Sequence, residues 1–249
     1  MAAETESESY ECSSEGHVTA GRQAVEKEWE AAWYEGDCKD ANREVSKWLK
    51  EHSDKLTGGK TNCRILVPLC GATRDMQWLM DEGHEVIGLE LVDKALHLFL
   101  DRHRINYTTS QVPSVNDGKC YKSKDKKLAL YRCNIFEMDM SLIGKVDCVW
   151  DCGAMTDIPP AERKDYSEII LSALKPGGRI LTETLAFGEI EGEDNDDEDE
   201  FRPVEEKDFQ KMYGERCSIE MLCEEDSKEA EEWGPSWWAK NRLHLLLLK

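Results

Sequence analysis

One short stretch of the chain, residues 63–90, has the pattern of a strand, a tight turn, a helix and a second strand. The first strand is the apolar run Arg64 to Val67, which Pro68 to Gly71 stops and turns. A helix over Thr73 to Glu82 follows, and the second strand ends at Glu90. This order predicts a βαβ unit, so Glu90 should lie at the carboxyl end of a strand in a parallel sheet.

The turn and the carboxylate limit the ligand that such a unit can bind. Open α/β sheets bind ligands at the carboxyl ends of their strands, and an acidic residue about 20 positions beyond the turn suits ribose hydroxyls, as Glu90 does beyond Gly71. A dinucleotide site needs three spaced glycines beside the pyrophosphate, whereas this turn has one. We therefore expect S-adenosylmethionine, which carries adenosine without phosphate. An ordinary βαβ unit with a surface glutamate is the alternative.

Composition and charge limit the partners of the chain. Its 249 residues, 40% of them apolar, are enough for one large α/β domain with an ample core. The formal charge of −20 argues against nucleic acid and anionic membranes, because surfaces that follow phosphates require clustered Lys and Arg. The longest apolar run, Leu245 to Leu248, is far shorter than the ~20 residues that span a bilayer. We expect a monomer that binds small molecules.

Cysteines and histidines bear on the compartment and on metal binding. The ten cysteines include no CxxC pair, and the N-terminus is acidic rather than basic and apolar. Both features predict reduced thiols and a cytoplasmic location. The six histidines show no metal-ligand spacing with nearby carboxylates or thiols, so we expect no metal.

Two segments are too acidic to contribute to a core. Residues 1–20 are dominated by Glu and Ser, and we expect a disordered tail there. Residues 189–200 contain nine acidic residues among twelve, and we expect a solvated insertion in a single domain over residues 21–249. The ligands of a calcium loop in this insertion would be Asp194, Asp196 and Glu198. That alternative lacks the Gly that an EF-hand requires at its sixth position.

Strands and helices continue to alternate through the rest of the chain. The expected helices are 93–103, 163–174 and 204–213, and the expected strands are 119–122, 128–133, 146–151, 180–184, 218–223 and 243–248. Pro176 to Gly178 should end the helix before them, and the last two strands suit an antiparallel hairpin. The predicted fold is α/β, with a doubly wound, mostly parallel sheet and an antiparallel edge hairpin. This is the layout of class I methyltransferases.

Several separate segments together resemble the thiopurine S-methyltransferase family. They are Glu28-Trp29 with Trp33, Pro68 to Gly71, Gly83 to Glu90, Asn134 to Phe136, and Trp150 to Ala154. Their order and spacing are far more specific than the turn alone, and the resemblance extends from Trp29 almost to the C-terminus. It implies methyl transfer from S-adenosylmethionine to the sulfur, or selenium, of a small acceptor.

The resemblance also implies which residues bind the cofactor. These are Trp29, Trp33, Asp40, Leu69, Gly71, Glu90, Asn134, Ile135 and Cys152. Leu69 and Gly71 would line the methionine end, Glu90 would bind the ribose, and Asn134 with Ile135 would border the adenine. Trp29 and Trp33 share one helix face, where aromatic rings beside a sulfonium contribute ~0.5 to 2 kcal/mol. Core packing of the two indoles, and a loop-opening role for Asn134, are the alternatives.

Departures from the family concern the acceptor. Cys152 stands where typical members have Arg, and a thiol cannot supply a guanidinium's charge or forked donors. We expect weaker recognition of anionic heterocycles and good use of small neutral thiols. Asp40 and Ala41 stand near the places of an aromatic residue and a His.

The candidates for a catalytic role are Asp151 and Cys152, at the end of an expected strand. Asp151 could orient a water or the cofactor, with helix capping as the alternative, and Cys152 could bind a soft acceptor or simply pack. Two other functions remain open at this level. One is a weakly catalytic relative that binds S-adenosylmethionine as a sensor or interaction module. The other is a nicotinamide-dependent oxidoreductase.

Overall fold

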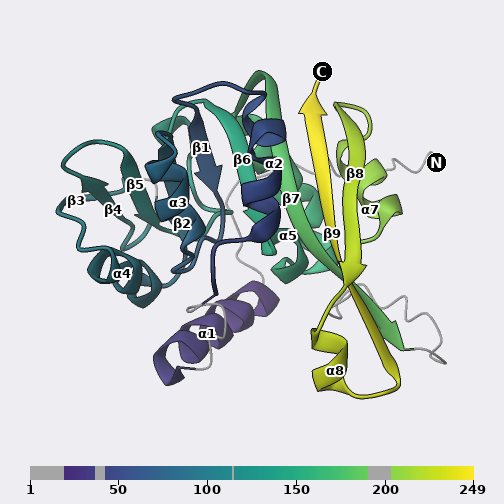
Figure 1. Ribbon diagram of the computed structural model, residues 1–249. Helices are drawn as coiled ribbons and strands as arrows, with labels where there is room; N and C mark the ends of the chain where they lie inside the picture. Colours follow the sequence, from purple (N-terminus) through teal and green to yellow (C-terminus); the bar gives the residue numbers. More distant parts are fainter. Residues whose placement is uncertain (1–19, 37–42, 114, 190–202) are drawn as a thin grey trace, which may run out of the picture.

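In the part of the chain that the structure describes, nine strands form one sheet in the order β3-β4-β5-β2-β1-β6-β7-β9-β8 (Figure 1). The computed structural model describes residues 20–36, 43–113, 115–189 and 203–249, so the predictions for the acidic tail, most of the acidic insertion and Asp40 lie outside it. The strands are β1 (Arg64–Val67), β2 (Glu85–Glu90), β3 (Tyr107–Gln111), β4 (Lys119–Ser123), β5 (Leu128–Arg132), β6 (Val146–Cys152), β7 (Leu174–Glu189), β8 (Cys217–Asp226) and β9 (Trp237–Leu248).

The five central strands are parallel, and both edges are antiparallel. Strands β5, β2, β1, β6 and β7 run in one direction. Strand β9 pairs antiparallel with both β7 and β8, while β3 and β4 add antiparallel strands beside β5. The predicted doubly wound, mostly parallel sheet with a late antiparallel hairpin is confirmed. Strand β3, whose Tyr107–Gln111 sequence is mostly polar and exposed, had no apolar signal that could predict it.

Helices cover both faces of the sheet. They are α1 (Ala20–Glu35), α2 (Lys47–Thr57), α3 (Asp75–Asp81), α4 (Asp93–Arg102), α5 (Ala154–Asp157), α6 (Arg163–Ala173), α7 (Glu206–Tyr213) and α8 (Glu229–Trp233), with short 3-10 turns at Met140–Leu142 and Pro160–Glu162. Successive strand residues point to opposite faces. Ile65 therefore packs with α2, α3 and α4, whereas Leu66 packs with α6 and α7.

Two local features differ from the sequence prediction. Helix α2 was not expected, although Ser46 caps it by accepting a hydrogen bond from the Leu49 backbone N–H, and Gly58 ends it in the left-handed region (φ 64°). The sequence predicted a helix over residues 163–174 that Pro176 to Gly178 would end. In the structure, Pro176 to Gly178 lie inside β7, where Leu174 pairs with Val146 and Arg179 pairs with Cys148. The extra residues loop out as a bulge, which the turn-forming Pro-Gly-Gly sequence permits.

The carboxyl ends of the parallel strands and helix α1 enclose the region of interest. In Figure 1, α1 lies beneath the sheet edge toward which the arrow of β1 points. Within the described part of the chain, no helix combines the length and the hydrophobicity that a membrane span requires. The same residues contain no group of three or more His, Cys, Asp or Glu side chains arranged to hold a metal ion.

Candidate functional site

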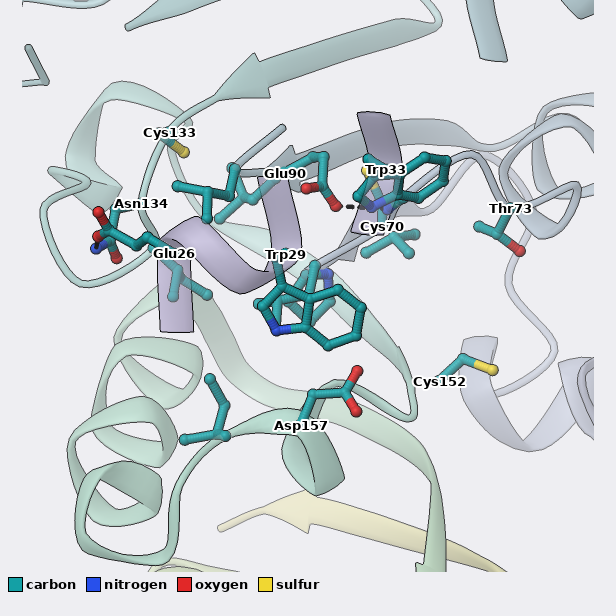
Figure 2. A pocket seen from close by; sticks show the side chains of 18 of the residues that line it. Glu26, Trp29, Trp33, Cys70, Thr73, Glu90, Cys133, Asn134, Cys152 and Asp157 are labelled. Carbon is teal, nitrogen blue, oxygen red and sulfur yellow. Dashed lines mark hydrogen bonds between the residues drawn. The ribbon is translucent and has the colours of Figure 1, made fainter. Parts of the chain in front are cut away.

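A cavity of about 370 Å³ lies between α1 and the carboxyl ends of the central strands (Figure 2). The predicted cofactor residues that line it are Trp29, Trp33, Leu69, Gly71, Glu90, Asn134, Ile135 and Cys152. They come from α1, the turns after β1 and β5, and the last residues of β2 and β6. The ninth predicted residue, Asp40, is not among the described residues. The fold thus gathers residues far apart in sequence around one space.

The turn after β1 is bonded to the end of β2. The backbone N–H of Cys70 donates to the carbonyl of Leu89 (2.9 Å), and the N–H of Gly71 donates to Oε2 of Glu90 (2.8 Å). Leu69 (φ 45°) and Gly71 (φ 50°) both lie in the left-handed region. For Leu69 that conformation carries a strain of ~1 to 3 kcal/mol, of the kind that ligand sites often contain. These bonds and dihedrals hold the turn close to the cavity.

Glu90 is a buried carboxylate with room for further donors. It is 7% exposed, and its two oxygens accept backbone hydrogen bonds from Gly71 and, at 2.8 Å, from Val92. Burial raises its pKa, while these hydrogen bonds oppose the rise. Each carboxylate oxygen has two acceptor sites, so each can also accept a hydroxyl of a ligand. The two hydroxyl donors of a ribose match that remaining acceptor capacity, so the site fits S-adenosylmethionine.

The two tryptophans of α1 meet the cavity in different ways. Trp33 is buried (8% exposed), and a Cβ added to Gly71 would lie 3.2 Å from its ring. Trp29 also lines the cavity but is 38% exposed. Any side chain at position 71 would therefore crowd both the ring and the cavity. The helical spacing of the two rings predicted the shared face correctly.

The Asn134 side chain joins the site to α1. Its Nδ2 donates to Oε1 of Glu26, and its Oδ1 accepts the backbone N–H of Phe136 (2.9 Å). The second contact is an Asx turn, the loop-opening role that sequence alone left as an alternative. Ile135 is buried and borders the cavity. At this end the protein therefore offers an apolar wall and backbone groups, with the amide side chain already bonded.

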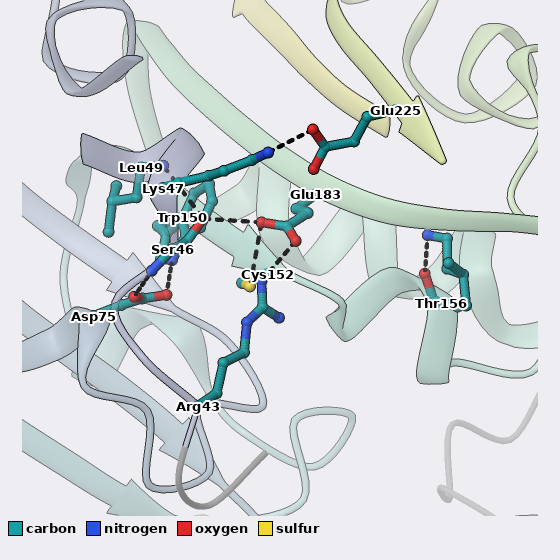
Figure 3. Close-up of polar contacts among 11 residues, drawn as sticks. Arg43, Ser46, Lys47, Leu49, Asp75, Trp150, Cys152, Thr156, Glu183 and Glu225 are labelled. Carbon is teal, nitrogen blue, oxygen red and sulfur yellow. Dashed lines mark hydrogen bonds and ion pairs between the residues drawn. The ribbon is translucent and has the colours of Figure 1, made fainter. Parts of the chain in front are cut away.

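The opposite end of the cavity contains a guanidinium that sequence reasoning missed. Arg43 lines the cavity, and its Nη2 donates to Oε1 of Glu183 (2.6 Å). Oε2 of Glu183 accepts hydrogen bonds from Oγ of Ser46 (3.0 Å) and from Sγ of Cys152 (3.8 Å) (Figure 3). Cys152 does not itself carry a charge like that of Arg, but a guanidinium reaches the same place from the segment before α2.

Sequence contained only part of the signal for this cluster. Glu183 lies near the carboxyl end of the expected strand over residues 180–184, and the same reasoning that singled out Glu90 could have singled it out. Arg43 has no such signal, since it precedes a helix that had not been expected.

Asp151 lies near the end of β6 but does not line the cavity. It is 1% exposed, and its oxygens accept hydrogen bonds from the hydroxyl of Tyr166 (2.8 Å) and the backbone N–H of Met155 (3.3 Å). Burial raises the pKa of its carboxyl to about 6. These contacts connect β6 to the start of α5 and to α6. They favour the capping role that was one of the two alternatives for this residue.

Comparison with known proteins identifies the family. The family model of thiopurine S-methyltransferase matches residues 24–246. The chain belongs to this family. A probable thiopurine S-methyltransferase of Danio rerio is 31% identical over 211 residues, which are 83% of this chain and 88% of that protein. The thiopurine S-methyltransferase of Rattus norvegicus is 28% identical over 240 residues, or 94% of this chain and 96% of that protein.

Solved structures share the fold of this family member. The 1,6-didemethyltoxoflavin-N1-methyltransferase of Burkholderia thailandensis, solved with S-adenosylhomocysteine, superposes with a TM-score of 0.62 at 14% identity, covering 94% of this chain and 93% of that one. The predicted class I methyltransferase fold is therefore confirmed. As a member of the thiopurine S-methyltransferase family, the protein is an S-adenosylmethionine-dependent S-methyltransferase. The relatives do not favour a non-catalytic sensor.

Proposed function

We propose that the protein methylates the sulfur, or selenium, of a small acceptor, and that the cavity holds the cofactor and the acceptor side by side. The observation that carries this proposal is the position of Glu90, a buried carboxylate bonded to the Gly71 turn, at one end of a cavity whose other end contains Arg43. Glu90 would bind the ribose, Ile135 would border the adenine, and Leu69 with Gly71 would line the methionine end.

The protein's part in the reaction is to position reactants and exclude water. When bound, S-adenosylmethionine supplies a methyl group on a positively charged sulfur. Trp29 and Trp33 present aromatic surface that stabilises such a cation and shields it from water. Holding two reactants in line can remove up to ~7 to 11 kcal/mol of the barrier in favourable cases. No general base is required if the acceptor arrives as a thiolate.

The proposed setting is a monomer in the cytoplasm that acts on small molecules rather than on nucleic acid. The described cysteines are all free thiols, which suits a reducing compartment. The formal charge of −20 would repel phosphate backbones. Gel filtration with light scattering tests the monomer, and binding titrations with duplex and single-stranded DNA test the second point.

Calorimetric titration of the Glu90→Ala variant tests the assignment of the cofactor site. S-adenosylmethionine binding should weaken by ~1 to 3 kcal/mol, because ribose hydroxyls lose a charged acceptor. Glu82→Ala is the matched control, since Glu82 is exposed at the end of α3 and does not line the cavity. Thermal melting of both variants checks folding. Tighter binding of NAD than of S-adenosylmethionine, or unchanged binding in Glu90→Ala, would contradict the assignment.

A further inference from the structure

The Arg43 guanidinium is the one positive group among the described residues that line the cavity. The other charged residues of the lining are Glu26, Glu90, Asp157 and Glu162. An acidic lining suits a cationic cofactor but repels an anionic acceptor. Among the described lining residues, Arg43 is therefore the only group that attracts a negative charge on an acceptor.

The guanidinium is held in place and retains donor capacity. Glu183, 9% exposed, accepts from Nη2 of Arg43 with one oxygen and from Ser46 with the other. A guanidinium has five N–H donors, and among the described residues this is the only hydrogen bond that Arg43 donates. The Arg43 side chain is 40% exposed, which leaves it accessible from the cavity.

The immediate surroundings keep Arg43 charged. The sulfur of Cys152, when it is a thiolate, is the largest cause that raises the pKa of the guanidinium, and Glu183 adds to the rise, while burial opposes it. Cys152 itself lies beside the same carboxylate, with Sγ 3.8 Å from Oε2 of Glu183. The sulfur of Cys152 therefore lies close to the Arg43–Glu183 pair.

We propose that Arg43 binds the sulfur of the acceptor as a thiolate and places it for methyl transfer, with Glu183 orienting the guanidinium. This inference rests on the proposed function and names the form of the substrate that the site takes. The acceptor releases its proton to solvent before transfer. The lone pair of its sulfur then forms the new S–CH3 bond as the sulfonium S–CH3 bond breaks, so a cation and an anion yield two neutral thioethers.

A neighbouring ion pair separates this role from simple anchoring of the segment before α2. Nη1 of Arg74 donates to Oε1 of Glu44 (2.9 Å), so it contacts the same segment as the Arg43–Glu183 pair, through a carboxylate that is more exposed than Glu183. Arg74 does not line the cavity. Arg43→Met and Arg74→Met therefore each remove one anchor, and only the first removes the charge that faces the acceptor.

The test is the ionisation of a bound acceptor. A benzenethiol whose thiolate absorbs outside the protein's own band is titrated with pH in the presence of S-adenosylhomocysteine, which fills the cofactor site without a methyl group. We expect the pKa of the bound thiol to lie about 1 to 3 pH units below that of the free thiol, as an opposite charge at short range produces. The lowering should disappear in Arg43→Met and persist in Arg74→Met.

Turnover supplies a second readout. The pH at which kcat is half-maximal reports ionisation in the bound complex, so in Arg43→Met it should move up toward the pKa of the free thiol. Arg43→Lys keeps the positive charge but lacks the planar, forked donors of a guanidinium. It should therefore retain part of the lowering of the thiol pKa. Thermal melting of all variants establishes that they are folded.

Three results would overturn the inference, and they have different meanings. If the bound thiol has the same pKa in Arg43→Met as in the wild type, Arg43 does not bind the thiolate, and the proposed function is unaffected. A loss of the same size in Arg74→Met shows that anchoring of the segment explains the effect. A wild-type protein that binds S-adenosylmethionine yet methylates no thiol or selenol overturns the proposed function together with this inference.

Discussion

Replacing Asp151 with Asn should remove a loss of stability that the wild-type protein undergoes between acidic and neutral pH. Asp151 is 1% exposed, and burial raises the pKa of its carboxyl to about 6, against an ordinary 3.8 that we take for the unfolded chain. Hydrogen bonds from Tyr166 and from the backbone only partly oppose this rise. The folded protein therefore holds the proton more tightly than the unfolded chain does. The stability linked to this group is fully present below pH 3.8 and is lost as the pH rises through 6.

The size of the effect follows from the two pKa values. The difference between 6 and 3.8, at 1.36 kcal/mol per pH unit, corresponds to about 3 kcal/mol at pH 7.5. At pH 4.5 the unfolded carboxyl is mostly ionised and the folded one is protonated, so the same linkage gives a loss of only ~1 kcal/mol. Asn does not ionise. Between these pH values, the free energy of unfolding of the wild type should thus fall by ~2 kcal/mol relative to Asp151→Asn.

Urea denaturation followed by far-ultraviolet circular dichroism at pH 4.5 and 7.5 measures this difference. Comparison of the two proteins cancels the titration of all other groups. Tyr166→Phe is an informative companion, because it removes the hydroxyl that donates to Oδ2 of Asp151 (2.8 Å) and should raise the carboxyl pKa further, which steepens the pH dependence. If the stability difference between wild type and Asp151→Asn is the same at both pH values, folding does not raise the pKa of this carboxyl, and the prediction is refuted.

Two other predictions concern the acceptor and the core. A benzenethiol that carries a carboxylate should have a kcat/KM about 10-fold lower than the neutral compound, because Glu26, Asp157 and Glu162 line the cavity. A repulsion of ~1.4 kcal/mol is enough for a tenfold decrease. Equal values of kcat/KM would refute this prediction. Trp150→Phe removes the Nε1–H that donates to buried Asp75 (2.8 Å) and leaves a cavity where the fully buried indole was, so it should lower the free energy of unfolding by at least ~1 to 3 kcal/mol in urea denaturation. An unchanged urea midpoint would show that the carboxylate finds another partner.

Much of the central fold could be predicted because its signals are local. The apolar run Arg64–Val67, the glycine turn and the strand that ends at Glu90 are a short βαβ unit, and the structure contains it with the same β1 bounds. Local signals did not predict the segments whose structure depends on pairing with a neighbouring strand. Strand β3 is polar and forms because β4 provides an antiparallel partner, and β7 passes through a Pro-Gly-Gly bulge because β6 pairs on both sides of it.

By itself the sequence determined that a carboxylate ends β2 beside a single-glycine turn and that two indoles share one face of α1, because both features depend on residues close together in the chain. The tertiary structure decided which groups meet at the end of the cavity that contains Arg43. Arg43 and Glu183 are separated by 140 positions, and neither lies in a periodic pattern that indicates a partner. Their meeting beside Cys152 depends on β7 lying next to β6 and on the path of the chain into α2, which only the packing of the whole sheet determines.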